Sequence, residues 1–174
     1  MYHTQCLMND KQIDDLWDFI SAQNFKDVQI DEGVAMSVCD VPDKIKRLIL
    51  EEVREQTGKN LEPIVIYTRF NDEDFDTSFR VHSDGYIMGQ KVDWASVLYL
   101  TTGPTGTALL THPEHGDESG GLIFTEDDGK WEVVKIFPEV ENTMAIYPAN
   151  KHHSRWPAKA KEFRFVIVGF FKEA

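Results

Sequence analysis

The sequence is poor in cysteine and has no long apolar segment, and both features narrow the class of protein. Cys6 and Cys39 are the only cysteines in 174 residues and form no CxxC pair, which argues against a disulfide framework or a redox motif. No apolar run approaches the roughly 20 residues that cross a bilayer. The opening MYHTQCLMNDKQ also lacks the basic and then apolar pattern of a secretory signal. We therefore expect a soluble cytoplasmic protein that does not act at a membrane.

Positive charge is also scarce. The chain has 18 Lys and Arg against 30 Asp and Glu, which gives a formal net charge of −12. Such a surface repels the phosphates of nucleic acid, so we expect no nucleic-acid partner. The acidity indicates no other partner, and the sequence leaves the oligomeric state open.

Internal repeats and long Pro-, Gly- or Ser-rich linkers are absent, and the apolar fraction of 41% is that of a globular protein. We predict a single domain over the whole chain, residues 1–174. A helical support is expected in about residues 1–60. One helix begins at Asn9 or the residue after it, and a second begins near Pro42 and ends at Gly58. Both carry apolar residues at helical spacing, which indicates packing against a sheet.

Short β-rich runs dominate the chain from residue 62 onward, and turn-forming stretches separate them. Many short strands at this spacing, with no alternating helical segments, are typical of a β-sandwich or barrel. We therefore predict a mainly β protein with flanking helices, whose core is a jelly roll over about residues 62–172. The expected strands lie at 64–67, 79–82, 95–100, 107–110, 131–137, 143–147 and 163–171.

The segment RVHSDG carries the most informative pattern. In an extended strand, side chains two apart face the same way, so His82 and Asp84 are expected to project together. An imidazole and a carboxylate side by side supply two ligands to one metal ion. The H-x-D pattern is common by chance, however, and in isolation it describes a hydrogen-bonded surface pair equally well.

A second pattern supplies further nitrogen ligands. The segment YPANKHHSRWP places His152 and His153 just before the final predicted strand. Two histidines and one carboxylate on one side of a metal are the arrangement of non-haem iron(II) oxygenases, which leaves positions open for substrate and dioxygen. Distant segments of an antiparallel sandwich lie side by side, so one of these histidines can join His82 and Asp84. The other is expected in a turn, facing solvent.

A buried cation is predicted in the last strand. Arg164 shares a face of FRFVIVGFF with Val166 and Val168. A guanidinium on an apolar face cannot lose its charge, so it requires an anion. That anion is either an Asp or Glu of the chain or a carboxylate of a bound dicarboxylate. Tyr99 is either a second donor to such a carboxylate or a core tyrosine.

His82-x-Asp84, a distant His153 and Arg164 eleven positions later resemble the pattern of the 2-oxoglutarate- and iron(II)-dependent dioxygenases. The prolyl 4-hydroxylase-like branch, including its small bacterial and phage members, is the most similar, and the resemblance covers the whole β-rich part. It implies a double-stranded β-helix fold. It also implies His82, Asp84 and His153 as iron ligands, and Arg164 with Tyr99 as contacts of the 2-oxoglutarate tail.

The resemblance implies a reaction as well. Such an enzyme uses iron(II), 2-oxoglutarate and dioxygen, with ascorbate as a stimulant, and couples decarboxylation of 2-oxoglutarate to succinate with hydroxylation of a C–H bond. The expected substrate is a peptidyl residue such as proline, or a small molecule. Two alternatives stay open: a cupin-like metalloenzyme that does not use 2-oxoglutarate, and a non-catalytic β-sandwich that binds a ligand or partner.

Three further side chains are predicted near the substrate. Arg155 and Trp156 follow His153 closely enough to line the mouth of the site, and Tyr67 lies in the first strand of the β-rich part. The alternatives are that Arg155 faces water and that Trp156 packs in the core or at its rim.

Two loops, residues 71–79 and 111–121, are expected to shape the pocket. The first is acidic, and the arginines that flank it are expected to balance its charge. The second holds His112 and His115 in the segment THPEHG. We predict a solvated surface loop there in preference to a second metal site.

Overall fold

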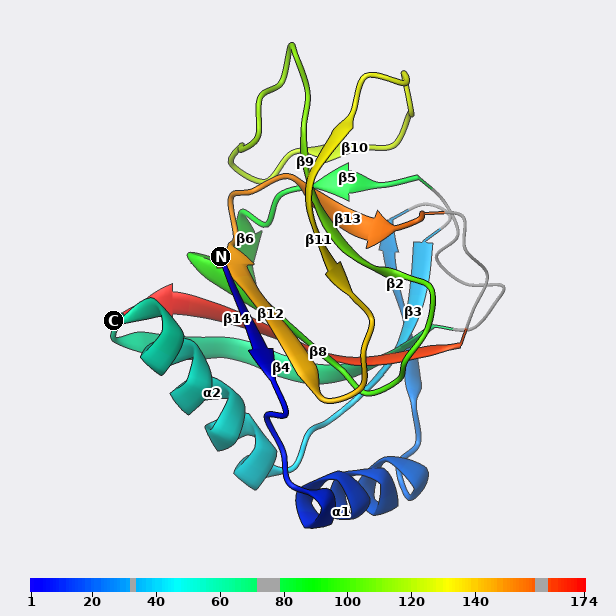
Figure 1. Cartoon of the computed structure of the whole chain (residues 1–174), viewed down its shortest axis with the longest axis vertical. Helices are drawn as coiled ribbons and strands as arrows, with labels where there is room; N and C mark the ends of the chain where they lie inside the picture. Colours follow the sequence, from blue (N-terminus) through cyan, green and yellow to red (C-terminus); the bar gives the residue numbers. More distant parts are fainter. Residues whose placement is uncertain (32–33, 72–78, 159–162) are drawn as a thin grey trace.

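In the computed structural model, which describes residues 1–31, 34–71, 79–158 and 163–174, two antiparallel sheets lie face to face and two helices cover the outer face of the larger sheet (Figure 1). The strands of the larger sheet, in spatial order, are β1 (Tyr2–Gln5), β12 (Thr143–Pro148), β8 (Trp94–Tyr99), β14 (Arg164–Glu173), β4 (Leu61–Asn71), β3 (Val34–Cys39) and β2 (Lys26–Asp31). Those of the smaller sheet are β10 (Ile123–Phe124), β5 (Val81–His82), β13 (His153–Trp156), β9 (Gly106–Thr111) and β11 (Glu132–Pro138). A hairpin of β6 (Tyr86–Ile87) and β7 (Gln90–Lys91) completes the described strands.

The two predicted helices are confirmed, and their ends follow from local chemistry. Helix α1 (Asp10–Ser21) starts at a capping box, in which the Asn9 side chain accepts from the Gln12 N–H and the Gln12 side chain accepts from the Asn9 N–H, both at 2.9 Å. Helix α2 (Asp43–Thr57) stops at Gly58, whose φ of 66° is the left-handed conformation that glycine adopts readily. Among the described residues, no helix is long and apolar enough to span a membrane.

The apolar side chains form two main layers, one on each face of the larger sheet. Ile167 and Phe171 of β14 pack with both helices, whereas Val166 and Val168 point between the two sheets. This alternation follows from the two-residue repeat of a strand. It places Arg164 on the face that looks toward the smaller sheet.

The prediction of a mainly β fold with flanking helices is confirmed, but the strand content of the first third was underestimated. The segment predicted as helical support contains β1, β2 and β3. At the margins of the larger sheet, β1 pairs with β12, β3 pairs with β4, and β2 pairs with β3. Short edge strands have weak sequence signals because one of their sides has no partner strand. In the expected loop 71–79, residues 72–78 lie outside the described part of the chain.

Candidate metal centre

Three side chains from two neighbouring strands meet at one point. His82 ends β5, Asp84 follows it, and His153 opens β13; the strands are antiparallel, with His82 and His153 directly paired. The two imidazole rings lie 4.3 Å apart between centroids. Asp84 Oδ1 lies 3.8 Å from His82 Nε2, and Asp84 Oδ2 lies 3.4 Å from His153 Nε2. Each residue thus offers one ligand atom within 4.8 Å of the others, and the described residues hold no second group of this kind.

A hydrogen bond fixes which nitrogen of His153 faces this point. His153 Nδ1 lies 2.8 Å from the Lys151 carbonyl oxygen, which can only accept, so Nδ1 carries the proton. Nε2 is then the nitrogen that faces Asp84 and is placed to ligate a metal. Histidines that ligate metals commonly donate their second N–H in this way.

The electrostatics of the three residues fit a metal ion. Asp84 Oδ2 is buried and accepts no hydrogen bond from the described residues, and burial raises the pKa of this carboxyl. Burial, with the neighbouring His153, Arg80 and Arg69, holds the pKa of His82 well below its ordinary value, so its imidazole is neutral. A divalent cation would satisfy the buried oxygen and bind the two imidazoles. Two imidazoles and one carboxylate are also the donor set of a non-haem iron(II) site.

His152 points away from this site, and the expectation that it faces solvent is wrong. It is fully buried on the other side of β13, because successive side chains of a strand alternate. Its Nδ1 donates to the Gly116 carbonyl at 3.0 Å, so its Nε2 accepts from Ser119 Oγ at 2.8 Å. Ser119 in turn accepts from Ser83 Oγ at 2.8 Å, and Ser83 accepts from the Gly121 N–H at 2.9 Å. Ser83 lies between His82 and Asp84 in the sequence, and His152 precedes His153. The Ser83–Ser119–His152 chain of hydrogen bonds therefore links the two segments that carry the three site residues.

A cavity of about 100 Å³ lies beside the three residues and also reaches Arg164. Arg164 is only 6% exposed and shares its face of β14 with Val166 and Val168, as predicted. The structure therefore brings the buried guanidinium of Arg164 and the three side chains of the candidate metal centre to the same cavity. A small carboxylate in this cavity can contact both Arg164 and the group formed by His82, Asp84 and His153.

Tyr99 lies behind this cavity. Its side chain is fully buried, and its hydroxyl donates to Thr107 Oγ1 at 2.6 Å. The ring centroid lies 5.6 Å from the guanidinium carbon of Arg164. Thr107 lines the cavity and Tyr99 does not, so Tyr99 packs behind Thr107 and Arg164. The contact of Tyr99 with a cosubstrate stays a prediction.

Tyr147 is a cavity residue that the sequence analysis missed. It comes from β12, lines the cavity, and has its ring centroid 4.8 Å from that of His153. Burial raises the pKa of its phenol well above the ordinary value, and the nearby Asp84 carboxylate adds to this shift. The phenol is therefore a neutral hydrogen-bond donor. No motif marks Tyr147 in the sequence, where it looks like any inward residue of a strand.

The three residues predicted near the substrate divide into two groups. Tyr67 and Arg155 line the cavity, and Arg155 Nη2 donates to the Ala158 carbonyl at 2.8 Å. Trp156 does not line it. This ring lies one position further along β13 and packs on the opposite face, beside the apolar cluster that includes Val81.

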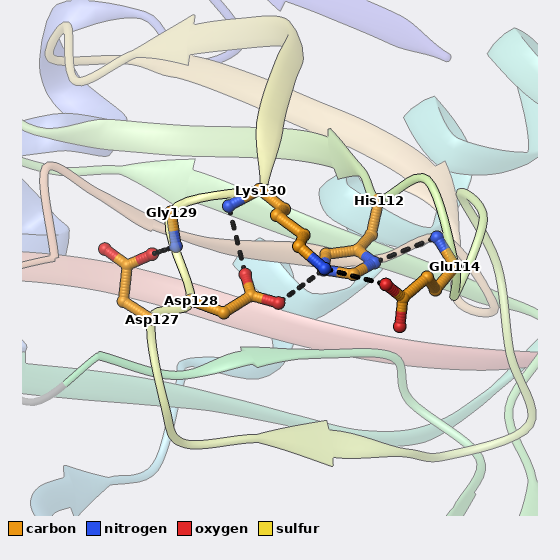
Figure 2. A network of polar contacts seen from close by, with 6 residues as sticks. All are labelled: His112, Glu114, Asp127, Asp128, Gly129 and Lys130. Atoms are coloured by element: carbon orange, nitrogen blue, oxygen red, sulfur yellow. Dashed lines mark hydrogen bonds and ion pairs between the residues drawn. The ribbon is translucent and has the colours of Figure 1, made fainter.

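The loop that follows β9 is exposed over residues 113–118, as predicted, but His112 at its start is buried. His112 is 2% exposed; its Nδ1 accepts from the Glu114 N–H at 3.1 Å and its Nε2 donates to Asp128 Oδ2 at 2.8 Å (Figure 2). The ring of His115 lies nearby in tilted contacts, with its centroid 4.5 Å from that of His112 and 4.6 Å from that of Phe124. Because both nitrogens of His112 are hydrogen-bonded, one to Glu114 in the same loop and the other to Asp128 in the loop between β10 and β11, they are not available to a metal.

Comparisons with known proteins give structural likeness without close sequence relatives. No family model and no curated protein matches the chain. The non-heme alpha-ketoglutarate-dependent carbocyclase SnoK from nogalamycin biosynthesis matches with a TM-score of 0.69 at 9% identity, over 99% of this chain and 79% of its own. HygX from Streptomyces hygroscopicus, with nickel and 2-oxoglutarate bound, gives 0.62 at 8% identity, over 99% and 82%. A Pseudomonas putida prolyl-4-hydroxylase gives 0.56 at 13% identity, over 99% and 92%.

At these identities the likeness shows the fold. The chain has the double-stranded β-helix fold of 2-oxoglutarate-dependent enzymes, as the resemblance in its sequence implied.

Proposed function

We propose that this protein is a 2-oxoglutarate- and iron(II)-dependent oxygenase. The observation that carries the proposal is the meeting of His82, Asp84 and His153 at the cavity that Arg164 reaches. A metal site alone fits many functions, and a buried arginine alone fits a core ion pair. Together, on this fold, they match the two requirements of a 2-oxoglutarate oxygenase: a metal with open positions and a cation for the distal carboxylate.

In the proposed enzyme, His82, Asp84 and His153 hold iron(II), and Arg164 binds the distal carboxylate of 2-oxoglutarate. Bound there, the iron and 2-oxoglutarate supply the activation of dioxygen that oxidises a C–H bond, with decarboxylation to succinate. The protein's contribution is to hold these groups in position, in a cavity that Val97, Val166 and Val168 line on its apolar side.

Thr107 and Tyr147 are further candidates for contacting 2-oxoglutarate. The Thr107 hydroxyl accepts from Tyr99 and so keeps its own hydrogen for the cavity. Tyr147 presents a neutral phenol in the cavity that Asp84 and Arg164 also line, and both of these residues affect its pKa. Each hydroxyl can donate to a carboxylate that Arg164 binds, in the way predicted for Tyr99.

For the substrate, we propose a small molecule, with a peptidyl residue such as proline as the alternative. Solved structures similar to this chain include HygX with hygromycin B bound and the epimerase SnoN with nogalamycin RO, whereas the prolyl-4-hydroxylase supports the alternative. The proposed reaction is hydroxylation, which mass spectrometry detects as the gain of one oxygen atom by the substrate.

The visible absorption of the anaerobic protein tests the proposal. Iron(II) and 2-oxoglutarate together are expected to give a weak charge-transfer band, which His82→Ala abolishes and Arg164→Ala weakens. The matched control is Lys130→Gln, on the exposed loop outside the smaller sheet, which should leave the band unchanged. Metal binding that 2-oxoglutarate does not affect would favour the cupin-like alternative. The absence of metal binding would favour the non-catalytic β-sandwich.

A further inference from the structure

An open groove runs from the candidate metal centre to the surface. It has a volume of about 870 Å³ and shares Tyr67, His82, Asp84 and Phe170 with the inner cavity, so the two spaces adjoin. This volume lies in the range of about 300–1,000 Å³ that is typical of pockets for drug-sized ligands. The inner cavity, of about 100 Å³, is much smaller. A substrate whose reacting carbon lies near the metal therefore has room for the rest of its body in the groove.

One wall of the groove is the face of the larger sheet that looks toward the smaller one. Val28 of β2 is directly paired with Met36 of β3, and Val65 of β4 with Phe170 of β14, and all four line the groove. Val38 lies two residues from Met36 and on the same face of β3. These side chains form a continuous apolar surface across four neighbouring strands.

The hairpin of β6 and β7 also lines the groove, and it exposes large apolar side chains there. Tyr86 is 73% exposed and Met88 is 76% exposed. Ile123 of β10, which is 44% exposed, continues this lining. Exposed apolar side chains that gather along a groove indicate a ligand with apolar surface.

The backbone at Met88 supports the same interpretation. The hairpin pairs Ile87 with Gln90, so Met88 and Gly89 form a two-residue turn, and their φ angles are 51° and 74°. Two positive φ angles are those of a type I′ turn, in which asparagine or aspartate commonly precedes the glycine. A methionine in this conformation is strained, and its exposed apolar surface adds a second cost. Contact with an apolar ligand in the groove accounts for both features.

Polar side chains lie mainly at the end of the groove beside the metal centre. Those that line both the groove and the inner cavity are Tyr67, Arg69, Arg80, His82 and Asp84. Outside that end, the polar side chains among the described lining residues are Ser83 and Tyr86, and Ser83 is hydrogen-bonded to Ser119 and Gly121. A peptide or a sugar carries many polar groups, and each one buried without a partner costs free energy. The outer groove therefore favours an apolar ligand over either of these.

We infer that the substrate is a small molecule with an extended apolar body, aromatic or alicyclic, that lies in the groove against Met36, Tyr86 and Met88. Its reacting carbon lies at the metal centre. This inference rests on the proposed oxygenase function and specifies its substrate class. A peptide, a carbohydrate and a second copy of the chain are the alternative occupants of the groove.

Binding of ligands with graded apolar surface tests the inference. The full chain is loaded with nickel(II), which prevents turnover, and with saturating 2-oxoglutarate. Isothermal titration calorimetry then compares the neutral amides benzamide and 2-naphthamide with the peptide acetyl-Ala-Pro-Ala-amide and with maltose. We expect 2-naphthamide to bind about 5- to 10-fold more tightly than benzamide, because the second ring buries more apolar surface. Its binding should show a negative heat-capacity change, and the peptide and maltose should bind more weakly.

Variants of the hairpin assign the effect to residues. Tyr86→Ser and Met88→Asn should each lower the affinity for 2-naphthamide by about 3- to 10-fold and reduce its advantage over benzamide, because apolar contact is lost. Met88→Asn should at the same time raise Tm by about 1–4 °C, because asparagine is favoured at positive φ. A residue that only builds the turn would not change stability and binding in opposite directions.

Two matched controls lie outside the groove. Cys6→Asn places the same side chain at another exposed position with a positive φ, of 54°, and should leave the affinity for both amides unchanged. Val134→Ser removes an apolar side chain that is 60% exposed on β11 and should also leave both affinities unchanged.

Equal affinities of the two amides, tighter binding of the peptide or of maltose, or full affinity for 2-naphthamide in both hairpin variants would overturn the inference. Sedimentation of the free chain provides a further check. A dimer that Tyr86→Ser dissociates would show that a second copy covers the groove, and would overturn the inference as well.

The charge-transfer band separates this inference from the function it rests on. A band without a preference for the larger amide would remove the inference and leave the oxygenase proposal intact. A preference for the larger amide without a band would remove the oxygenase proposal, and with it the claim that the bound molecule is a substrate.

Discussion

At the scale of single residues, the buried carboxylate of Asp84 lowers the stability of the folded protein until a cation binds. Its Oδ2 is buried without a hydrogen bond from the described residues, and the raised pKa of the carboxyl means that the folded state disfavours its ionised form. At neutral pH the metal-free protein therefore holds a buried carboxylate whose desolvation His153 and Arg80 offset only in part. A bound divalent ion removes that cost and gains two imidazole ligands as well.

Asp84→Asn should separate stability from metal binding. The neutral amide removes the buried charge, so the metal-free variant should be as stable as the parent or more stable by about 1 kcal/mol at neutral pH. This gain should vanish as the pH falls below the ordinary pKa of an aspartate, because the parent carboxyl is then protonated in both folded and unfolded states. Iron(II) affinity should fall by at least about 100-fold. Denaturant unfolding and metal titration measure the two effects.

The control for this prediction is Asp117→Asn. Asp117 is exposed and pairs with Lys151, away from the cavity. Its loss should leave metal affinity within about twofold, because an exposed ion pair contributes little. An Asp84→Asn variant that binds iron(II) as tightly as the parent would exclude Asp84 as a ligand.

Tyr147→Phe and Tyr99→Phe should have opposite profiles. Tyr147 lines the cavity, so loss of its hydroxyl should weaken 2-oxoglutarate binding about 10-fold or more with little effect on stability. Tyr99 donates to Thr107 in the core, so its loss should cost about 1 kcal/mol of stability and affect 2-oxoglutarate less. Titration of the visible band and thermal unfolding report the two quantities. A larger binding defect in Tyr99→Phe would assign the carboxylate contact to Tyr99.

Residues with a local signature could be predicted from the sequence, and residues placed by strand pairing could not. The two-residue alternation put His82 and Asp84 on one face, and a charged residue in an apolar strand identified Arg164 as buried. Tyr147 and Thr107 reach the same cavity only through the registers of β12 and β9, which the sequence does not specify.

At the scale of elements, the strands that carry the site are short and weakly joined. Strand β5 has two residues, and it pairs with β13 at a single position, His82 with His153. The Ser83–Ser119–His152 chain adds a side-chain connection across the same two strands on the opposite face. The backbone of Gly85 also lies close to the loop between β9 and β10, so that a Cβ at this position would be 2.9 Å from Gly121 Cα.

Ser119→Ala should therefore weaken the metal site without touching it. Loss of the central hydroxyl leaves Ser83 and His152 unconnected, so His82 and His153 are held together less firmly. Second-sphere changes of this kind typically cost about 10- to 100-fold in metal affinity. Ser119→Thr keeps the hydroxyl and should restore most of the affinity. The readout is metal titration with the charge-transfer band, and a variant with lowered stability but unchanged band and affinity would show that Ser119 is purely structural.

The same elements show where sequence patterns were informative. Helices α1 and α2 were predicted because caps and apolar spacing lie within a few neighbouring residues. Strand β13 was missed because its four residues, His153–Trp156, include charged and polar side chains in place of an apolar alternation. Functional strands of this kind depart from the apolar pattern that identifies a strand.

At the scale of the whole molecule, metal binding should couple to global stability. The three proposed ligands lie on the smaller sheet, and the cavity beside them also contacts β14 and β12 of the larger one. The predicted single domain requires both sheets to unfold in one transition. A ligand that binds only the folded state at about 100 times its Kd then adds about 2.7 kcal/mol. For a chain of this size, that raises Tm by roughly 5–11 °C.

Calorimetry with and without metal tests this coupling. Iron(II) under anaerobic conditions, or nickel(II), should raise the Tm of one cooperative transition, and a chelator should reverse the shift. Magnesium should have little effect, because imidazole ligands suit transition metals better than hard cations. His82→Ala should keep the metal-free transition and lose the shift. Two separate transitions would contradict the single domain, and a single transition that metal does not move would mean that the three side chains meet for a reason other than binding an ion.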